Sequence, residues 1–469
     1  MAQNLFGLPN EIINYILSLI PRSDYTKLCL VNKSLRYYTE PFLYSTISLR
    51  WDHYHIPPIV SLLRTLFQRS ELFSYIDSVS LYGSGFRAPP ASLDTTRIPL
   101  DRFSAAINEF QVPYIGLWVN KLRSGLSSMD TLAGLLIANL SNTSFLAITY
   151  NFIDKFDITG QVLQSKILGQ LPKFKQLSRL IYHRQMDEIF SEDEEVFPLA
   201  ISLFYLPTVT DLIITVPNPA VFQWPAGEPH LDRLTSLEVE WVYPRYLAKI
   251  LAHTKNLKSF SWNWEYCPDP TEEPDSNLDY DQIIATLLPL KGTLERLQFR
   301  LHCNKELDNP EISISGSLNG LRDFERLIYL DMPLISLTGL AIEPQPLERH
   351  IPHSVETLCL TKTLLLHDNA AQWMLDSESD PQEGGILETE TEDDHLEAHF
   401  WEKPIIDVLR ALAEKCPPSL PQLRHIIFVE DCDLSGSRMI SPMRQLDLEH
   451  EIEFKILSEG SWTQRYLPG

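Results

Sequence analysis

The sequence predicts an α/β repeat protein, in which an N-terminal three-helix unit precedes a solenoid with parallel strands on its concave face and helices outside. Three observations lead to this fold class. The first fifty residues carry apolar positions at helical spacing, the pattern apolar-x-x-apolar-x-apolar then recurs ten times, and helical segments precede many of these copies. One strand and one helix per unit, with all strands running the same way, is the geometry of a repeat solenoid. We expect the helical unit over residues 1–50 and the solenoid over residues 51–469.

Composition and charge limit the function classes. The chain has 469 residues, of which 44% are hydrophobic and 10% aromatic, so it can bury a large core. Its net charge of −23 repels a phosphate backbone or an anionic membrane surface, so we expect neither nucleic acid nor membrane as a partner. The six cysteines form no C-x-x-C pair, residues 1–15 lack the features of a secretory signal, and no segment is apolar enough to span a bilayer. We expect a protein of the cytoplasm, the nucleus or both.

The first fifty residues predict three short helices. The apolar residues of the stretch Ile12–Ile20 recur at helical spacing, and Pro21 ends this helix. Ser23 or Asp24 can cap a second helix, and Asn32 can cap a third. A unit this small cannot bury all of its apolar side chains internally. Part of its apolar surface therefore needs a partner.

About a dozen residues of this unit follow a recognisable order. They read Leu8-Pro9-x-Glu11-Ile12, then Leu28-x-Leu30-Val31-Asn32-Lys33-x-Leu35, and finally Glu40-Pro41-x-Leu43-Tyr44. This order resembles the F-box, particularly the version common in fungal proteins, over residues 5–48. The resemblance implies docking on the Skp adaptor of a cullin-RING ubiquitin ligase. It places these residues in the adaptor interface: Leu8, Pro9, Ile12, Ile16, Leu28, Val31 and Leu35.

The alternative is a helical cap over the apolar end of the solenoid, as repeat proteins require. The leading Leu-Pro-x-Glu-Ile order favours the F-box, because a cap has no need for that order. Two positions depart from the F-box pattern. Leu35 stands where many F-boxes have an aromatic residue, and Lys33-Ser34 replaces the usual small-basic pair.

The recurring apolar pattern marks the strands of the expected solenoid. Most copies start 23 to 37 residues apart, but two gaps of 69 and 68 residues suggest a missed or overgrown repeat. Helical sequence precedes many copies, at residues 128–140, 244–253, 279–288 and 404–415. The ten copies are Ile76-Val79-Leu81, Phe145-Ile148-Tyr150, Leu177-Leu180-Tyr182, Val209-Leu212-Ile214, Leu234-Leu237-Val239, Leu257-Phe260-Trp262, Leu294-Leu297-Phe299, Leu327-Leu330-Met332, Val355-Leu358-Leu360 and Leu423-Ile426-Phe428.

These units resemble the irregular leucine-rich repeats that often follow an F-box. They depart from the family at position nine, where Asn or Cys normally bonds the turn backbone, because none of the ten copies has either residue there. A doubly wound α/β domain would show the same alternation of strands and helices, and it is the alternative fold.

Alternate strand positions predict the concave face. Positions one, four and six should point inward, while positions three, five and seven should be exposed. Such a face can hold a peptide with charges of both signs, and Arg296 with Arg300 can clamp a carboxylate or phosphate. Trp262 should pack between repeats, whereas Trp241 and Trp264 are candidates for exposed contacts. The candidate target-binding residues are Glu238, Glu240, Asn263, Arg296, Gln298, Arg300 and Tyr329; the alternative for each is an ordinary solvated surface.

Residues 376–399 contain ten acidic residues and no Lys or Arg, which predicts a flexible loop. Within it, His395-x-Glu397-x-His399 can in principle seat a metal ion on a helix, but the order differs from H-E-x-x-H and the segment is expected to be disordered. No nucleophile elbow, phosphate loop or paired Cys/His motif occurs. We therefore expect no metal, no cofactor and no catalysis in this chain.

Together these observations predict the substrate-recognition subunit of an SCF-type ubiquitin ligase. The F-box would bind the Skp adaptor, the repeats would hold an unidentified target protein, and other subunits would transfer ubiquitin. One alternative is a leucine-rich-repeat interaction scaffold with no ligase role. Another is an enzyme with an α/β core, which would need a deep pocket with converging titratable residues.

Overall fold

The computed structural model describes residues 8–83, 93, 98–124, 128–152, 158–183, 200–216, 221–266, 277–303, 313–338, 346–361, 402–416, 419–430, 439–449 and 452–458. The chain divides into two compact units, residues 1–234 and 235–469.

Unit 1 begins with the three predicted helices, α1 (Asn10–Ser18), α2 (Arg22–Val31) and α3 (Lys33–Ser45). Pro9 and Pro21 precede the first two helices, where a proline costs no intrahelical hydrogen bond. Asn32 caps α3, because its side-chain oxygen accepts a hydrogen bond of 2.8 Å from the backbone N–H of Leu35. The Tyr25 hydroxyl donates to the Leu17 carbonyl at 3.0 Å and ties α2 to α1.

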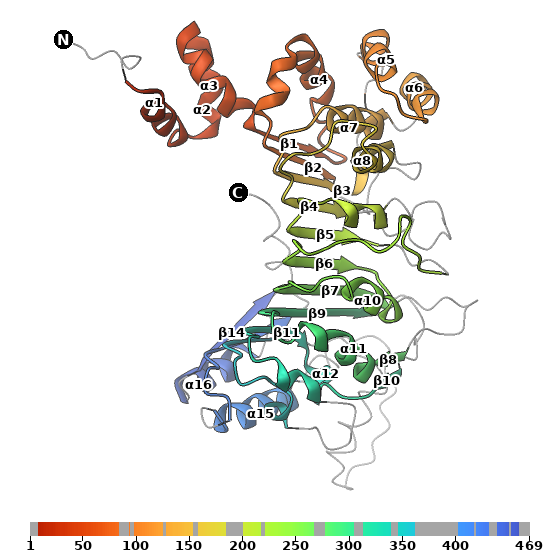
Figure 1. Cartoon of the computed structure of the whole chain (residues 1–469). Helices are drawn as coiled ribbons and strands as arrows, with labels where there is room; N and C mark the ends of the chain where they lie inside the picture. Colours follow the sequence, from red (N-terminus) through yellow and green to blue (C-terminus); the bar gives the residue numbers. More distant parts are fainter. Residues whose placement is uncertain are drawn as a thin grey trace, which may run out of the picture. The chain divides into compact units, whose positions relative to one another are not determined.

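Among its described residues, unit 1 has a sheet of five parallel strands that neighbour one another in chain order (Figure 1). The helices α1–α3 stand at its β1 end. The strands are β1 (Thr46–Trp51), β2 (Ser78–Gly83), β3 (Phe145–Thr149), β4 (Arg179–His183) and β5 (Asp211–Thr215). The other helices are α4 (Ile59–Gln68), α5 (Leu100–Asn108), α6 (Ile115–Ser124), α7 (Ser128–Ala138) and α8 (Ile158–Leu168), with 3-10 turns η2 (Ser70–Tyr75), η4 (Tyr150–Phe152) and η6 (Leu203–Tyr205).

In the part of unit 2 that the structure describes, seven parallel strands again follow chain order, and two further strands form a small separate pair. The seven strands are β6 (Ser236–Glu240), β7 (Ser259–Tyr266), β9 (Arg296–Cys303), β11 (Tyr329–Pro333), β12 (Thr357–Thr361), β13 (His425–Glu430) and β14 (Glu453–Ser458). The separate pair is β8 (Asn277–Asp279) with β10 (Ser313–Ser315). The helices are α10 (Pro244–Leu251), α11 (Tyr280–Leu287), α12 (Leu334–Thr338), α15 (Glu402–Glu414) and α16 (Ile440–Glu449), with 3-10 turns η7 (Leu288–Leu290), η8 (Asn319–Asp323) and η9 (Leu347–Arg349).

Each of the ten apolar copies corresponds to a parallel strand, and the order of the strands never reverses within either unit. A doubly wound sheet needs such a reversal, so this alternative does not fit. The two long gaps are overgrown connections, because β2 pairs directly with β3, and β12 pairs directly with β13. The last described strand, β14, pairs with β13.

The strand register corrects one of the ten copies. Val79 pairs with Leu146 and Leu81 with Ile148, so position one of the second copy is Thr143 rather than Phe145. Thr143 is fully buried and its hydroxyl donates to the Ile76 carbonyl at 3.2 Å. A hydrogen-bonded threonine thus occupies an inward position at which the pattern expects an apolar side chain. The apolar pattern was therefore assigned two residues too late in this copy.

A ladder of backbone hydrogen bonds joins successive repeats just before each strand. In unit 1, the N–H of Asp77 donates to Ser45, Ser144 to Asp77, Ser178 to Ser144 and Thr210 to Ser178, at 2.8–2.9 Å. In unit 2, Lys258 donates to Thr235, Glu295 to Lys258, Ile328 to Glu295, Glu356 to Ile328, Arg424 to Glu356 and Glu453 to Arg424, at 2.7–2.9 Å. These bonds use peptide groups alone. On the corrected register, position nine of the second copy is Asn151, while the other nine copies have neither Asn nor Cys there. Most repeats are therefore joined through peptide groups without either residue at position nine.

Lys166 in α8 is a buried cation whose nearest partners are carbonyl groups rather than a carboxylate. Its Nζ donates to the carbonyls of Leu140 at 2.6 Å and Pro172 at 2.7 Å, and lies 4.5 Å from the centre of the Phe174 ring. Burial lowers the pKa of this amine from 10.5 to about 7.

We predict that Lys166 makes unit 1 more stable as the pH rises from 7 to 10. The unfolded chain keeps the Lys166 proton over this range while the folded chain releases it, so the free energy of unfolding increases with pH. Relative to Lys166→Met, the wild type should gain about 2–4 kcal/mol between pH 7 and pH 10, measured by urea unfolding. Lys173→Met, which changes an exposed lysine nearby, is the control and should follow the wild type. Parallel curves for wild type and Lys166→Met would contradict the prediction.

Candidate functional site

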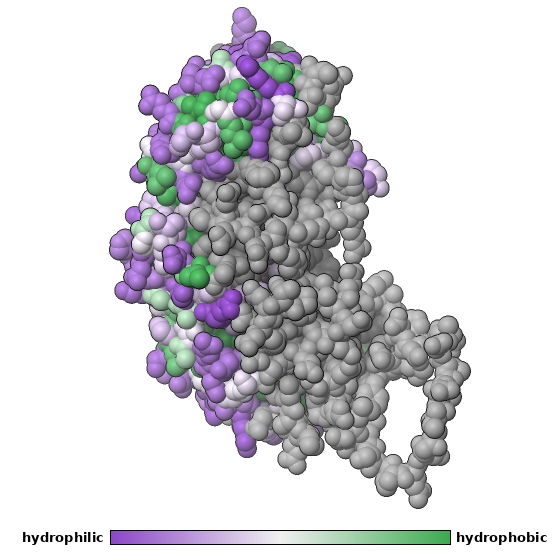
Figure 2. Space-filling model, turned by 90° about the vertical axis from the view of Figure 1, so that its right-hand side faces the viewer, coloured by the Kyte–Doolittle hydropathy of each residue, from purple (hydrophilic) through white to green (hydrophobic). Residues whose placement is uncertain are grey.

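The N-terminal helical unit exposes a concentration of apolar side chains. Seven of the fifteen exposed large hydrophobic residues in the described part of the chain fall within residues 8–37. On the side drawn in Figure 2, hydrophobic residues stand in small groups among hydrophilic ones. The concentration of exposed apolar side chains within residues 8–37 marks an interaction surface. The seven are Leu8, Ile12, Tyr15, Leu19, Leu30, Val31 and Tyr37.

Helix α1 has two apolar faces. Ile13 and Leu17 are buried inside the unit. Ile12, Tyr15 and Leu19 follow one another at steps of three and four, which places them on one exposed stripe. Leu8, just before the helix, is exposed as well. Leu30, next to the end of α2, is 82% exposed and extends the apolar surface beyond α1.

The structure divides the sequence-predicted adaptor residues by exposure. Leu8, Pro9, Ile12 and Val31 are exposed, while Ile16, Leu28 and Leu35 are half-buried. Their role in adaptor binding stays a prediction. Four other exposed apolar residues were not predicted from the sequence: Tyr15, Leu19, Leu30 and Tyr37. Helical spacing from Ile12 would have identified Tyr15 and Leu19.

A buried carboxylate fixes this unit to the rest of unit 1. Glu40, near the end of α3, accepts hydrogen bonds on both oxygens from Arg69, which follows α4, at 2.6 and 2.8 Å. Arg36 adds a third bond from its Nε at 2.7 Å. The bond from Arg69 is the main cause that lowers the pKa of Glu40 to about 2, against the effect of burial. The paired carboxylate therefore holds α3 against the segment after α4.

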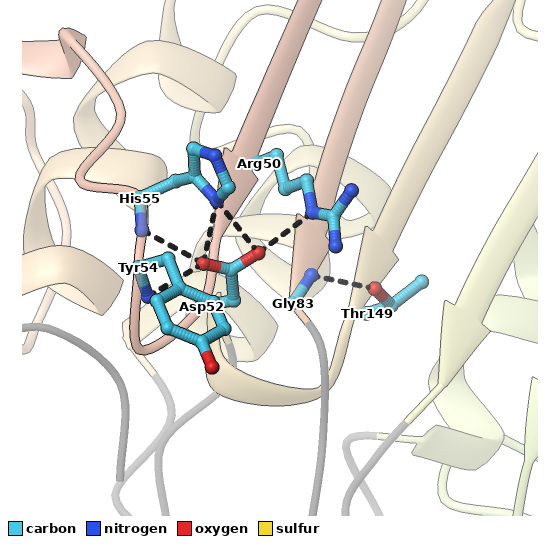
Figure 3. A network of polar contacts seen from close by, with 6 residues as sticks. All are labelled: Arg50, Asp52, Tyr54, His55, Gly83 and Thr149. Carbon is cyan, nitrogen blue, oxygen red and sulfur yellow. Dashed lines mark hydrogen bonds and ion pairs between the residues drawn. The ribbon is translucent and has the colours of Figure 1, made fainter. Parts of the chain in front are cut away.

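A second buried carboxylate organises the turn after β1 (Figure 3). Asp52 accepts from the backbone N–H groups of Tyr54 at 2.8 Å and His55 at 2.7 Å, and from Arg50 Nε at 2.7 Å. His55 Nδ1 lies 2.8 Å from the same carboxylate. Burial acts to raise the pKa of Asp52, but the bonds from His55 and the backbone lower it to about 2. With both oxygens occupied, Asp52 locks the turn and holds Tyr54 exposed.

By strand register, Asp52 occupies position nine of the first strand, because Thr46 pairs with Ser78 at position three. It therefore bonds the turn backbone where the regular leucine-rich pattern uses Asn or Cys. This first strand was not among the ten copies. At the neighbouring strand ends, the Gly83 N–H donates to Thr149 Oγ1 at 3.0 Å and joins β2 to β3 (Figure 3).

The outward strand face of unit 2 is less exposed than predicted. Glu238, Ser261 and Tyr329 are buried, and so are the next outward positions of β11, Asp331 and Pro333. Neighbouring strands supply part of the cover, since the Arg296 guanidinium lies 4.0 Å from the centre of the Tyr329 ring. The expectation of exposure, drawn from each strand alone, was wrong for these positions because side chains of adjacent strands stand next to one another.

Trp264 is also buried rather than exposed. It stacks on Trp262, with ring centres 5.6 Å apart and planes inclined by 9°. Trp262 is fully buried, as expected for packing between repeats. Trp241 is half-buried and directly follows β6.

The register does bring the target-binding candidates together on four neighbouring strands. Glu238, Ser261, Gln298 and Asp331 form one row across β6, β7, β9 and β11. Asn263 donates to Glu238 at 2.8 Å. Arg296 is exposed, while Glu240, Asn263, Gln298 and Arg300 are half-buried. Burial raises the pKa of the Asp331 carboxyl to about 6. Target binding by these residues stays a prediction.

Neither metal nor membrane features emerge from the described residues. No group of three or more His, Cys, Asp or Glu side chains in these ranges could hold a metal ion. None of the described helices is both long and apolar enough to cross a bilayer. The acidic segment 376–399, with His395, Glu397 and His399, lies outside the described residues.

Comparison with known proteins supports the first of these sites. Residues 5–39 match the F-box domain family. This match covers α1, α2 and the first half of α3, where the apolar stripe and the Asn32 cap lie. No curated protein matches the chain. F-box domains bind the Skp adaptor within cullin-RING ligases, and F-box proteins are in general non-catalytic receptors.

We predict that Glu40→Gln destabilises unit 1 at neutral pH. Because the folded pKa of about 2 is below the ordinary value of 4.5, the carboxylate contributes stability above about pH 4.5 and loses it as the pH falls toward 2. The variant should lose about 2–3 kcal/mol in unfolding free energy at pH 7, and the difference should shrink at pH 3. Glu71→Gln, which removes a more exposed partner of Arg69, should cost clearly less than Glu40→Gln. Equal losses in both variants would contradict this role of Glu40.

Proposed function

We propose that this chain is the substrate-recognition subunit of an SCF-type ubiquitin ligase. Its F-box binds the Skp adaptor, and its strand repeats, which we assign to the irregular leucine-rich type, hold a target protein. The observation that carries the proposal is the F-box match at residues 5–39 on helices whose apolar residues are exposed. An F-box without a partner would leave this apolar surface in water.

The arrangement supports a receptor rather than an enzyme. A receptor contributes by holding the target near the conjugating enzyme, which raises its effective concentration and needs no reactive group on this chain. The buried Asp52 and Glu40 carboxylates serve the fold in this view, because hydrogen bonds and ion pairs occupy both oxygens of each. Ubiquitin transfer then takes place on other subunits.

The adaptor interface consists of the exposed α1 stripe together with Leu30 and Val31. The sequence-predicted residues Leu8, Pro9, Ile12 and Val31 belong to it. Ile16, Leu28 and Leu35 are half-buried and contribute the atoms that remain accessible. Tyr15 and Leu19 extend the stripe of α1.

We predict that Ile12→Asp and Val31→Asp each abolish the complex with the Skp adaptor. A charge in the centre of an apolar contact must be desolvated without a partner, so affinity should fall at least about a hundredfold. Co-expression with the adaptor followed by gel filtration measures the complex. Leu448→Asp, which changes an 87% exposed leucine on α16, should leave it intact.

Circular dichroism checks that the variants stay folded, as expected when repeats contact mainly their neighbours. Melting of the strand repeats in Ile12→Asp would favour the cap interpretation of the helical unit. A wild-type chain that forms no adaptor complex would favour the interaction scaffold without a ligase role. Recovery of the adaptor with no cullin would also favour the scaffold.

A further inference from the structure

Four buried polar atoms without a hydrogen-bond partner lie together on the outward side of β7, β9 and β11. Ser261, Gln298 and Asp331 are direct register partners on the three strands, so their side chains form one row. Asn263 follows two residues after Ser261 on the same side of β7. The four atoms are Ser261 Oγ, Asn263 Oδ1, Gln298 Nε2 and Asp331 Oδ1. We call these four residues the polar row.

Such a concentration needs an explanation. Buried polar groups in native proteins nearly always have a hydrogen-bond partner, because an orphaned group has lost its water and gained nothing. The four atoms are closed to solvent, so bulk water does not satisfy them. Asp331 is 1% exposed; its carboxyl has the Tyr329 hydroxyl and the Cys359 thiol as neighbours, and its Oδ1 is left without a hydrogen bond. Atoms left in this state would lower the stability of the free chain.

The atoms of the polar row require a ligand that both donates and accepts. Asp331 Oδ1 and Asn263 Oδ1 need donors, Gln298 Nε2 needs an acceptor, and Ser261 Oγ can serve either way. A phosphate or carboxylate would offer acceptors only and would face the Asp331 carboxyl. A cation would offer donors only and would face Arg296 and Arg300, whose charges act on Asp331. A neutral amide group supplies both functions.

The rim of the polar row carries aromatic and strained residues. Trp241 has a φ of 71°, a left-handed conformation that bulky residues rarely adopt, and its backbone N–H donates to the Asn263 carbonyl at 2.8 Å. Strained backbone of this kind gathers at ligand-binding sites. On the opposite side, Tyr329 directs its hydroxyl at the second Asp331 oxygen, 3.4 Å away.

We propose that the polar row binds an extended segment of a target polypeptide through the main-chain amide groups of that segment. The inference rests on the proposed function, because it assumes that the chain receives a protein target. Each peptide group of the segment offers one N–H and one carbonyl, the two functions that the row lacks. Binding opens the row, and the recovered hydrogen bonds offset the cost of opening it.

The first test compares melting temperatures of the full chain. Ser261→Ala and Gln298→Leu each remove an orphaned group, so the Tm should stay unchanged or rise. Ser259→Ala, two residues earlier on the same strand, is the matched control. A Tm lowered by more than the control in both variants would show that the groups already have partners in the free chain and would overturn the proposal.

The second test measures binding with a displayed library of random 12-residue peptides, selected on the full wild-type chain. Peptides enriched on the wild type are synthesised, and their Kd is measured by fluorescence anisotropy. Gln298→Leu and Asp331→Leu should each weaken them at least about tenfold, while Ser259→Ala should leave the Kd unchanged. Methylation of one central peptide nitrogen should cause a similar loss, whereas single alanine substitutions should not.

Three outcomes would overturn the proposal: no enriched peptide, equal binding by the Gln298→Leu variant, or a loss that follows a charged side chain instead of the backbone nitrogen. Adaptor binding is measured on the same preparations by gel filtration. An adaptor complex without peptide binding removes the polar-row inference alone. Peptide binding without an adaptor complex removes the ligase role and leaves the polar row in place.

Discussion

Backbone hydrogen bonds between successive repeats are the constraint on which this structure depends. Each strand pairs in parallel with its neighbour, and the residue just before it donates its N–H to the equivalent carbonyl of the previous repeat. This arrangement satisfies peptide groups that burial would otherwise leave without partners. Because it uses no side chain, connections as different as the long insertion before β3 and the shorter one before β12, which contains α12 and η9, fit within their sheets.

The helical unit depends on a different interaction. Its internal core, formed around Ile13, Leu17 and Tyr25, is small, and the Glu40 to Arg69 pair joins it to the segment after α4. A bidentate pair between these groups fixes distance and orientation at once. The pair thereby holds the helical unit, with the exposed apolar residues of α1, against the rest of unit 1. This fits an adaptor contact, which has to transmit the position of a bound target.

The outward strand face shows how stability and recognition differ along one sheet. The inward positions are filled by apolar side chains, as in Leu237, Phe260, Leu297 and Leu330. The outward row at the middle of unit 2 instead keeps buried polar atoms without partners. A row left in this state would weaken the free protein, and departures from the rules of stable packing are expected where a protein has to bind something else.

Much of the architecture could be predicted from the sequence, because the spacing of apolar residues and the residues that begin or end helices are local properties. The stripe from Ile12, the stop at Pro21 and the Asn32 cap predicted α1–α3, and the apolar triplets predicted ten parallel strands. The same local order pointed to the F-box that residues 5–39 match. Only the tertiary structure decided what depends on neighbours distant in sequence. Thr143 is inward because its hydroxyl reaches Ile76 across 67 residues, and Tyr329 is buried beneath Arg296, 33 residues earlier. The exposure and the contacts of a side chain depend on which strands lie side by side. A short stretch of sequence does not contain that information.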